Sequence, residues 1–105
     1  MTVLITGGSG FIGANIAKHL ADKDEDIIIF DLAHPIKERK WLLSDVHDRI
    51  EFEYGDIRDF STFLRTVKKY KIESIVHASA IVDPMLSIRQ PRPFFKVNVE
   101  GTLNV

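Results

Sequence analysis

The sequence lacks cysteine altogether, which excludes disulfides, thiolate nucleophiles and cysteine-ligated zinc. Its charges nearly cancel, with 14 Lys plus Arg against 15 Asp plus Glu, so no basic surface for nucleic acid is indicated. No apolar run approaches the roughly 20 residues that span a bilayer, and no signal peptide precedes the first strand-like run. The four histidines lack metal-ligand spacing. We therefore expect one cytoplasmic α/β or α+β domain without metal, nucleic-acid or membrane partners.

Strand-like and helix-like segments alternate along the chain. Strands are expected at 2–6, 27–30, 50–54 and 74–77, where apolar and β-branched residues cluster. The first helix is expected to begin at 11 and to end before a polar break at 22–26, and the second to run from 36 to about 45. The third is expected to begin at 60, after a cap at Asp59, and the last to run from about 93 to 105. A loop is expected at 78–91. This order predicts an α/β fold, a Rossmann-type doubly wound parallel sheet of strand order 3-2-1-4.

Apolar spacing also predicts which helix faces are buried. The first helix is expected to present one large-residue face, with alanines close by, and the third to repeat apolar residues at i, i+3, i+4 and i+7. A short apolar run in the second helix is expected in the core. The residues concerned are Phe11, Ile12, Ile16 and Leu20 in the first helix, Trp41, Leu42 and Leu43 in the second, and Phe60, Phe63, Leu64 and Val67 in the third.

A glycine cluster separates the first strand from the first helix. Gly8, Gly10 and Gly13 fit G-x-G-x-x-G, and Gly7, Gly10 and Gly13 fit G-x-x-G-x-x-G. In either template the first glycine permits the tight turn, the middle one lets a diphosphate approach the backbone, and the third allows close helix packing. Free N–H groups and the dipole at the helix start would hold the diphosphate. The alternative is a glycine-rich turn that binds no ligand.

An acidic residue ends the second strand. The carboxylate of Asp31 is placed to accept hydrogen bonds from adenosine ribose hydroxyls and to repel a 2′-phosphate. No basic residue follows immediately, since Lys37 and Arg39 come later, on the second helix. The pattern favours NAD over NADP as cofactor. A helix cap or a solvated strand end is the alternative role for Asp31.

Four segments together resemble the extended short-chain dehydrogenase/reductase family, and more narrowly its NAD-dependent epimerase/dehydratase group acting on nucleotide sugars. They are the T-G-G-S-G-F-I-G turn at 6–13, Asp31, the G-D-I-R-D segment at 55–59 and the N-V-E-G-T segment at 98–102. The resemblance covers essentially the whole chain. One departure is Ser79 within His77-Ala78-Ser79-Ala80, where the family usually reads H-x-A-A.

The resemblance implies roles for residues along the cofactor. It implies that Asp56 and Ile57 hold the adenine. It gives the cofactor-binding set Gly7, Gly10, Phe11, Ile12, Gly13, Asp31, Asp56, Ile57, Ala78, Ser79 and Ala80, the last three lining the middle of the dinucleotide. Asp56 has the alternative of stabilising the turn before the third helix. His77 is expected to be a satisfied strand-end histidine rather than a base, and Asn98 to bridge the last helix and the strand-4 loop.

The family's Tyr-x-x-x-Lys catalytic couple is not found in these residues. Arg58 and Ser74 stand four positions after Tyr54 and Tyr70, so neither tyrosine has the paired lysine. We expect an N-terminal fragment, cut within the last helix, without the catalytic region and the substrate lobe, and therefore inactive by itself. Such a piece would expose the fourth strand's edge and apolar residues of the last helix, which favours self-association.

Two other functions stay open from the sequence. One is another extended NAD(P)-dependent reductase, of the hydroxysteroid or flavonol type, against which Asp31 argues mildly. The other is a non-catalytic sensor or scaffold that binds NAD, because a fold alone does not fix a function.

Overall fold

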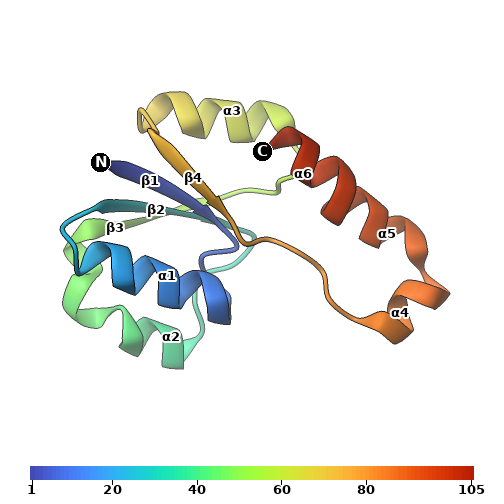
Figure 1. The fold of residues 1–105 in the computed structure, drawn as a ribbon, viewed down its shortest axis with the longest axis horizontal. Helices are drawn as coiled ribbons and strands as arrows, with labels where there is room; N and C mark the ends of the chain where they lie inside the picture. Colours follow the sequence, from blue (N-terminus) through green and yellow to red (C-terminus); the bar gives the residue numbers. More distant parts are fainter.

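A computed structural model describes all 105 residues and contains a four-stranded parallel sheet with helices on both faces (Figure 1). The strands are β1 (Thr2–Thr6), β2 (Asp26–Asp31), β3 (Ile50–Tyr54) and β4 (Ser74–His77), in the order β3-β2-β1-β4. Thr6 pairs with Phe30 on one side and with His77 on the other. The carboxyl ends of these strands therefore meet at one edge, as the predicted topology requires.

The two faces of the sheet carry separate apolar cores. Val3 and Ile5 of β1 pack with α1 (Phe11–Ala21), while Leu4 between them packs toward α3 (Phe60–Lys69) on the other face. This division follows from the two-residue period of a strand. Figure 1 shows α1 and α2 (Lys37–Leu42) below the sheet, and α3 above it.

The first helix uses its small residues, not its large ones, to contact the sheet. Gly13, Ala14, Ala17 and Ala21 are buried, whereas the side chains of Phe11 and Ile12 are 72% and 67% exposed. Small side chains let the helix backbone approach the sheet closely. The prediction that Phe11 and Ile12 belong to the buried face is therefore wrong, although Ile16 and Leu20 are partly buried against this core.

The second helix is shorter than predicted. It ends at Leu42 and is followed by a 3₁₀ segment, η1 (Ser44–Arg49). Leu43 and Val46 complete the core beneath the sheet, but Trp41 is 79% exposed. Assigning Trp41 to the core is thus wrong, because the chain leaves the α-helical path just after it and buries Leu43 instead.

The third helix begins where its cap predicts. The Asp59 carboxylate accepts hydrogen bonds from the Thr62 N–H at 3.2 Å and from the Thr62 hydroxyl at 2.6 Å. Phe63 is buried and meets the Phe30 ring edge-on, with 5.2 Å between ring centroids. Phe60 and Leu64, expected on the same face, are exposed.

The segment after β4 is more helical than predicted. It contains α4 (Pro84–Arg89), in which the Asp83 carboxylate accepts from the Leu86 N–H. A helical run then follows as α5 (Pro91–Phe95), the π-helical η2 (Lys96–Glu100) and α6 (Gly101–Asn104). In Figure 1, α4 and α5 extend away from the sheet, while α6 returns to lie beside α3. None of the helices is both long and apolar enough to cross a membrane.

Candidate functional site

A cleft of about 370 Å³ lies at the carboxyl edge of the sheet. Its lining contains several residues expected to bind the cofactor: Gly7, Gly10, Asp31, Asp56, Ile57, Ala78, Ser79 and Ala80. Three other residues of the expected set, Phe11, Ile12 and Gly13, form the first turn of α1 and are not part of the lining. The topology thus gathers segments from separate strand ends into one site.

Two glycines in the turn are required by the backbone itself. Gly7 has φ +69°, a left-handed conformation that favours glycine. A Cβ on Gly13 would lie 2.2 Å from the Gly7 carbonyl oxygen, so the helix could not approach the turn with a side chain there. Gly8, by contrast, has its Cβ position against the Ile29 side chain. A Cβ would be too close to its neighbours at either Gly7 or Gly8, but only Gly7 of the two lines the cleft, which favours Gly7-x-x-Gly10-x-x-Gly13 as the binding template.

Gly10 differs from both, because its backbone does not require glycine. Its φ of −78° and ψ of 177° are extended values open to any residue. The only atom near its Cβ position is the Gly7 carbonyl oxygen at 3.3 Å, and Gly10 lines the cleft. A side chain here would take up space that is otherwise left for a bound group.

The start of α1 presents unpaired donors. The N–H groups of Phe11, Ile12 and Gly13 have no acceptor in the chain, and the first turn carries no acidic side chain. The Ser9 hydroxyl, in the preceding turn, is buried without a partner. Free amides and the positive end of the helix dipole suit an anionic group, so these features fit the diphosphate of a dinucleotide.

Asp31 is held in place at the end of β2. Its Oδ2 accepts from the Ser9 N–H at 3.0 Å, and its Oδ1 accepts from the Leu32 N–H at 2.7 Å. The carboxylate thus ties the glycine turn to β2 while it lines the cleft. No basic side chain forms an ion pair with it.

Asp56 is paired with a residue that the sequence pattern did not place in the site. The Arg58 Nε lies 3.0 Å from both Asp56 carboxylate oxygens, and the Arg58 N–H donates to Oδ1 at 2.9 Å. The hydrogen bonds from the Arg58 side chain lower the pKa of Asp56, so its carboxyl group stays an acceptor. Asp56 therefore stabilises its own turn and lines the cleft as well.

Other lining residues were not predicted from the sequence. They are Phe30, Leu32, Gly55, Arg58, Ile81 and Val97. Most flank a residue that was identified, and adjacency at a strand end was the signal available. Val97 comes from the last helical run and has no such neighbour.

The segment that follows β4, residues 78–81, is called the strand-4 segment and is fixed by side chains from elements distant in the sequence. The Thr6 hydroxyl oxygen accepts from the N–H groups of Ala78 at 3.1 Å and Ser79 at 3.3 Å. Asn98 makes two hydrogen bonds to the backbone of Ile81, at 2.9 and 3.0 Å. The bridging role expected of Asn98 is confirmed, and both ring nitrogens of His77 have partners, as expected of a satisfied histidine.

Comparisons with known proteins agree with this geometry. The family model for GDP-mannose 4,6 dehydratase matches residues 4–105. CDP-paratose 2-epimerase of Salmonella typhi is 36% identical over all of this chain and 31% of its own length, and UDP-glucose 4-epimerase of Neisseria gonorrhoeae is 35% identical over 98% of this chain and 31% of its own. The solved UDP-glucose 4-epimerase of Thermus thermophilus, in complex with NAD, superposes with a TM-score of 0.82 at 30% identity, covering 99% of this chain and 32% of that one.

The chain therefore spans about a third of the length of these relatives. The expected resemblance to nucleotide-sugar epimerases and dehydratases is confirmed, as is the Rossmann-type fold. The match over nearly the whole chain, together with the glycine turn and the parallel sheet, shows that this chain belongs to the GDP-mannose 4,6 dehydratase family.

Proposed function

We propose that this chain binds NAD in the cleft and is the cofactor-binding part of a nucleotide-sugar epimerase or dehydratase. One observation carries the proposal. Gly10 leaves open space beside the unpaired amides of α1, although its backbone does not require glycine. The similarity to an epimerase solved with NAD supports the same interpretation.

The cleft and the adjacent first turn of α1 together offer a partner for each part of the dinucleotide. The amides of Phe11, Ile12 and Gly13 would hold the diphosphate, and Asp31 would accept hydrogen bonds from the adenosine ribose. Asp56 and Ile57 would contact the adenine, and the Ala78–Ala80 segment would line the middle of the cofactor. When bound, NAD supplies a hydride acceptor. The residues described here bind and orient it.

We propose that the 105-residue chain binds NAD but does not catalyse a reaction by itself. Tyr54 is 68% exposed, and neither it nor Tyr70 lines the cleft. The Tyr70 hydroxyl donates to Glu53 at 2.9 Å, and burial raises the pKa of Tyr70. A tyrosine that serves as proton donor and acceptor needs the opposite shift, so Tyr70 does not suit that role, and Tyr54 lies outside the cleft.

Asp31 is expected to make the chain select NAD over NADP. The wild-type chain should bind NAD at least about tenfold more tightly, because the 2′-phosphate would meet a fixed carboxylate with no basic partner. Asp31→Asn should narrow this ratio, measured by isothermal titration with both dinucleotides. Asp48→Asn removes an exposed charge from η1 and is the matched control. Tighter binding of NADP by the wild-type chain would contradict this assignment.

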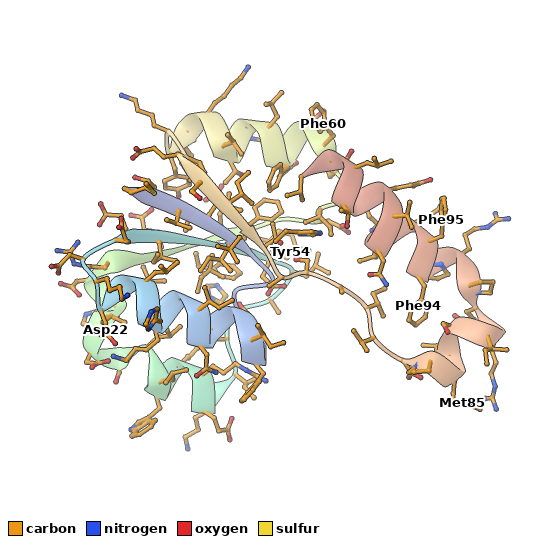
Figure 2. All side chains as sticks on the ribbon, viewed as in Figure 1. Asp22, Tyr54, Phe60, Met85, Phe94 and Phe95 are labelled. Carbon is orange, nitrogen blue, oxygen red and sulfur yellow. The ribbon has the colours of Figure 1, made fainter.

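We also propose that the chain associates with a second copy of itself through the last helical run. Phe95, Val99 and Leu103 are exposed at a spacing of four residues, which places them along one helix face. Val97 of the same helical run is not part of this patch, because it packs against the core beneath α3. Figure 2 shows Phe95 on the last helical run, together with Met85 of α4, away from the sheet. β4 is an edge strand of the sheet and has one unpaired side.

Sedimentation velocity should show dimer formation that increases with protein concentration. Phe95→Ser combined with Leu103→Ser should shift the chain toward monomer, since both substitutions remove exposed apolar area. Trp41→Ser, which removes an even more exposed aromatic side chain elsewhere, should leave the dimer unchanged. A wild-type chain that remains monomeric at high concentration would refute the proposal.

A further inference from the structure

A continuous chain of side-chain hydrogen bonds links β1, the end of β4 and the last helical run. The Thr6 hydroxyl oxygen lies 2.6 Å from His77 Nδ1, and His77 Nε2 lies 2.9 Å from the Thr102 hydroxyl oxygen. The Thr102 hydroxyl donates in turn to the Asn98 carbonyl oxygen at 2.6 Å. We call Thr6, His77 and Thr102 the histidine relay. It joins β1 to α6 through the end of β4.

The bonds of the histidine relay fit a single arrangement of protons. The Thr6 oxygen already accepts from the amides of Ala78 and Ser79, which uses its two lone pairs. Its proton must therefore be donated to His77 Nδ1. With Nδ1 as acceptor, the neutral ring carries its proton on Nε2 and donates it to the Thr102 oxygen, whose own proton goes to Asn98.

A protonated ring does not fit this arrangement. Nδ1–H would then be a donor facing the Thr6 oxygen, which would have to release an amide in order to accept it. The Ala78 amide also donates to the Thr6 carbonyl oxygen at 3.1 Å, so its position does not depend on the hydroxyl. The Ser79 amide has no second acceptor, and its bond to the hydroxyl, at 3.3 Å, is the longer of the two. Protonation of His77 therefore competes with the Ser79 amide for the Thr6 oxygen and is coupled to the position of Ser79 in the cleft wall.

No charged side chain offsets this conflict. β1, β4 and α6, which carry the histidine relay, contain no charged residue apart from His77 itself when protonated. The basic and acidic side chains of the other elements on this face make no hydrogen bond to the ring: Arg65, Lys68 and Lys69 of α3, and Lys96 and Glu100 of η2. Burial lowers the pKa of His77, so the ring is neutral at neutral pH.

We infer that Thr6 and His77 are positioning residues that hold the Ser79 backbone in its dinucleotide-binding position only while the His77 ring is neutral. This inference rests on the proposed NAD binding for its functional consequence. Binding of NAD should weaken as the pH falls through the pKa of His77, since the binding-competent form carries no proton on Nδ1. Because burial lowers the pKa of His77, the loss from pH 7.5 to about pH 5 should stay below the roughly thirtyfold that an ordinary histidine would give.

Isothermal titration with NAD across this pH range tests the functional part. His77→Asn should bind NAD with the same affinity at both pH values, because its Oδ1 can accept from Thr6 and does not titrate. His47→Asn removes a histidine of η1 that bonds only to Ser44, and should keep the wild-type pH dependence. Wild-type affinity that does not change with pH, or His77→Asn that loses affinity as the wild type does, would overturn the inference.

Nuclear magnetic resonance of the free chain tests the histidine relay without any cofactor. Nitrogen shifts of the His77 ring should show the Nε2–H form at neutral pH, and a titration below the ordinary histidine value. Amide exchange at Ser79 should accelerate in Thr6→Val and stay slow in Thr6→Ser, which keeps the hydroxyl, whereas the Ala78 amide keeps its bond to the Thr6 carbonyl oxygen in both variants. An Nδ1–H ring, or equal Ser79 exchange in the two variants, would refute the histidine relay. Failure of the wild-type chain to bind NAD at pH 7.5 would instead refute the proposed function.

Discussion

Replacing Gly10 by valine is expected to lower the affinity for NAD by at least about a hundredfold while the chain stays folded. The extended backbone at Gly10 accepts a β-branched residue, and the Cβ position is near one atom only, the Gly7 carbonyl oxygen at 3.3 Å. The valine methyl groups would therefore project into the space beside the unpaired amides of α1. Binding is lost because the diphosphate and the side chain cannot share that space.

Isothermal titration with NAD measures this loss, and urea unfolding checks that the fold is retained. Gly10→Ala adds one methyl group at the same position and should give an intermediate affinity, which links the effect to volume. A valine variant that binds NAD as tightly as the wild type would show that the glycine turn does not hold the diphosphate.

Gly13→Ala is expected to act on the fold. Its Cβ would lie 2.2 Å from the Gly7 oxygen and 2.7 Å from the Gly8 Cα, and both are backbone atoms that cannot turn aside. Alanine favours a helix over glycine by up to about 1 kcal/mol. Overpacking of this kind costs about 1–3 kcal/mol and sometimes more, and the severity of this overlap places it at the upper end, so destabilisation prevails.

Urea unfolding should show the Gly13→Ala chain to be less stable than the wild type by about 2 kcal/mol. Gly10→Ala is the matched control, since the same methyl group three residues earlier meets much less resistance. Unchanged or increased stability of Gly13→Ala would mean that the helix does not approach the turn as closely as described.

The strand order and the place of the cleft could be predicted from the sequence, because they depend on local signals that recur in order. The β-branched run at Thr2–Thr6, the glycine turn and Asp31 each mark a strand end. Parallel pairing then brings those ends to one edge. The sequence pattern is sufficient here because parallel pairing by itself places the carboxyl ends of the paired strands at the same edge.

Helix faces were harder to predict because size and burial do not always coincide. The large residues Phe11 and Ile12 face solvent in the first turn of α1, while Ala14 and Ala17 allow the helix to lie close to the sheet. Apolar periodicity gives weight to large residues and therefore assigned Phe11 and Ile12 to the buried face. For α4, the Asp83–Pro84 pair was a usable signal, because a capping acid followed by proline is typical of a helix start.

The details of the site depend on contacts that spacing does not specify. The pairing of Arg58 with Asp56 requires the turn after β3 to bring the guanidinium back onto the carboxylate. The histidine relay depends on β4 lying beside β1 and on α6 returning to the sheet, which joins residues 71 and 25 positions apart. Such partners become visible only when the tertiary structure is known.

A proton–nitrogen correlation spectrum of the labelled chain, recorded while NAD is added, reports directly on whether the glycine turn holds the diphosphate. We expect the largest shift changes on the amides of Gly10, Phe11, Ile12 and Gly13, at the start of α1. Changes concentrated elsewhere in the chain, or none at saturating NAD, would place the diphosphate outside the glycine turn or show that the chain does not bind NAD.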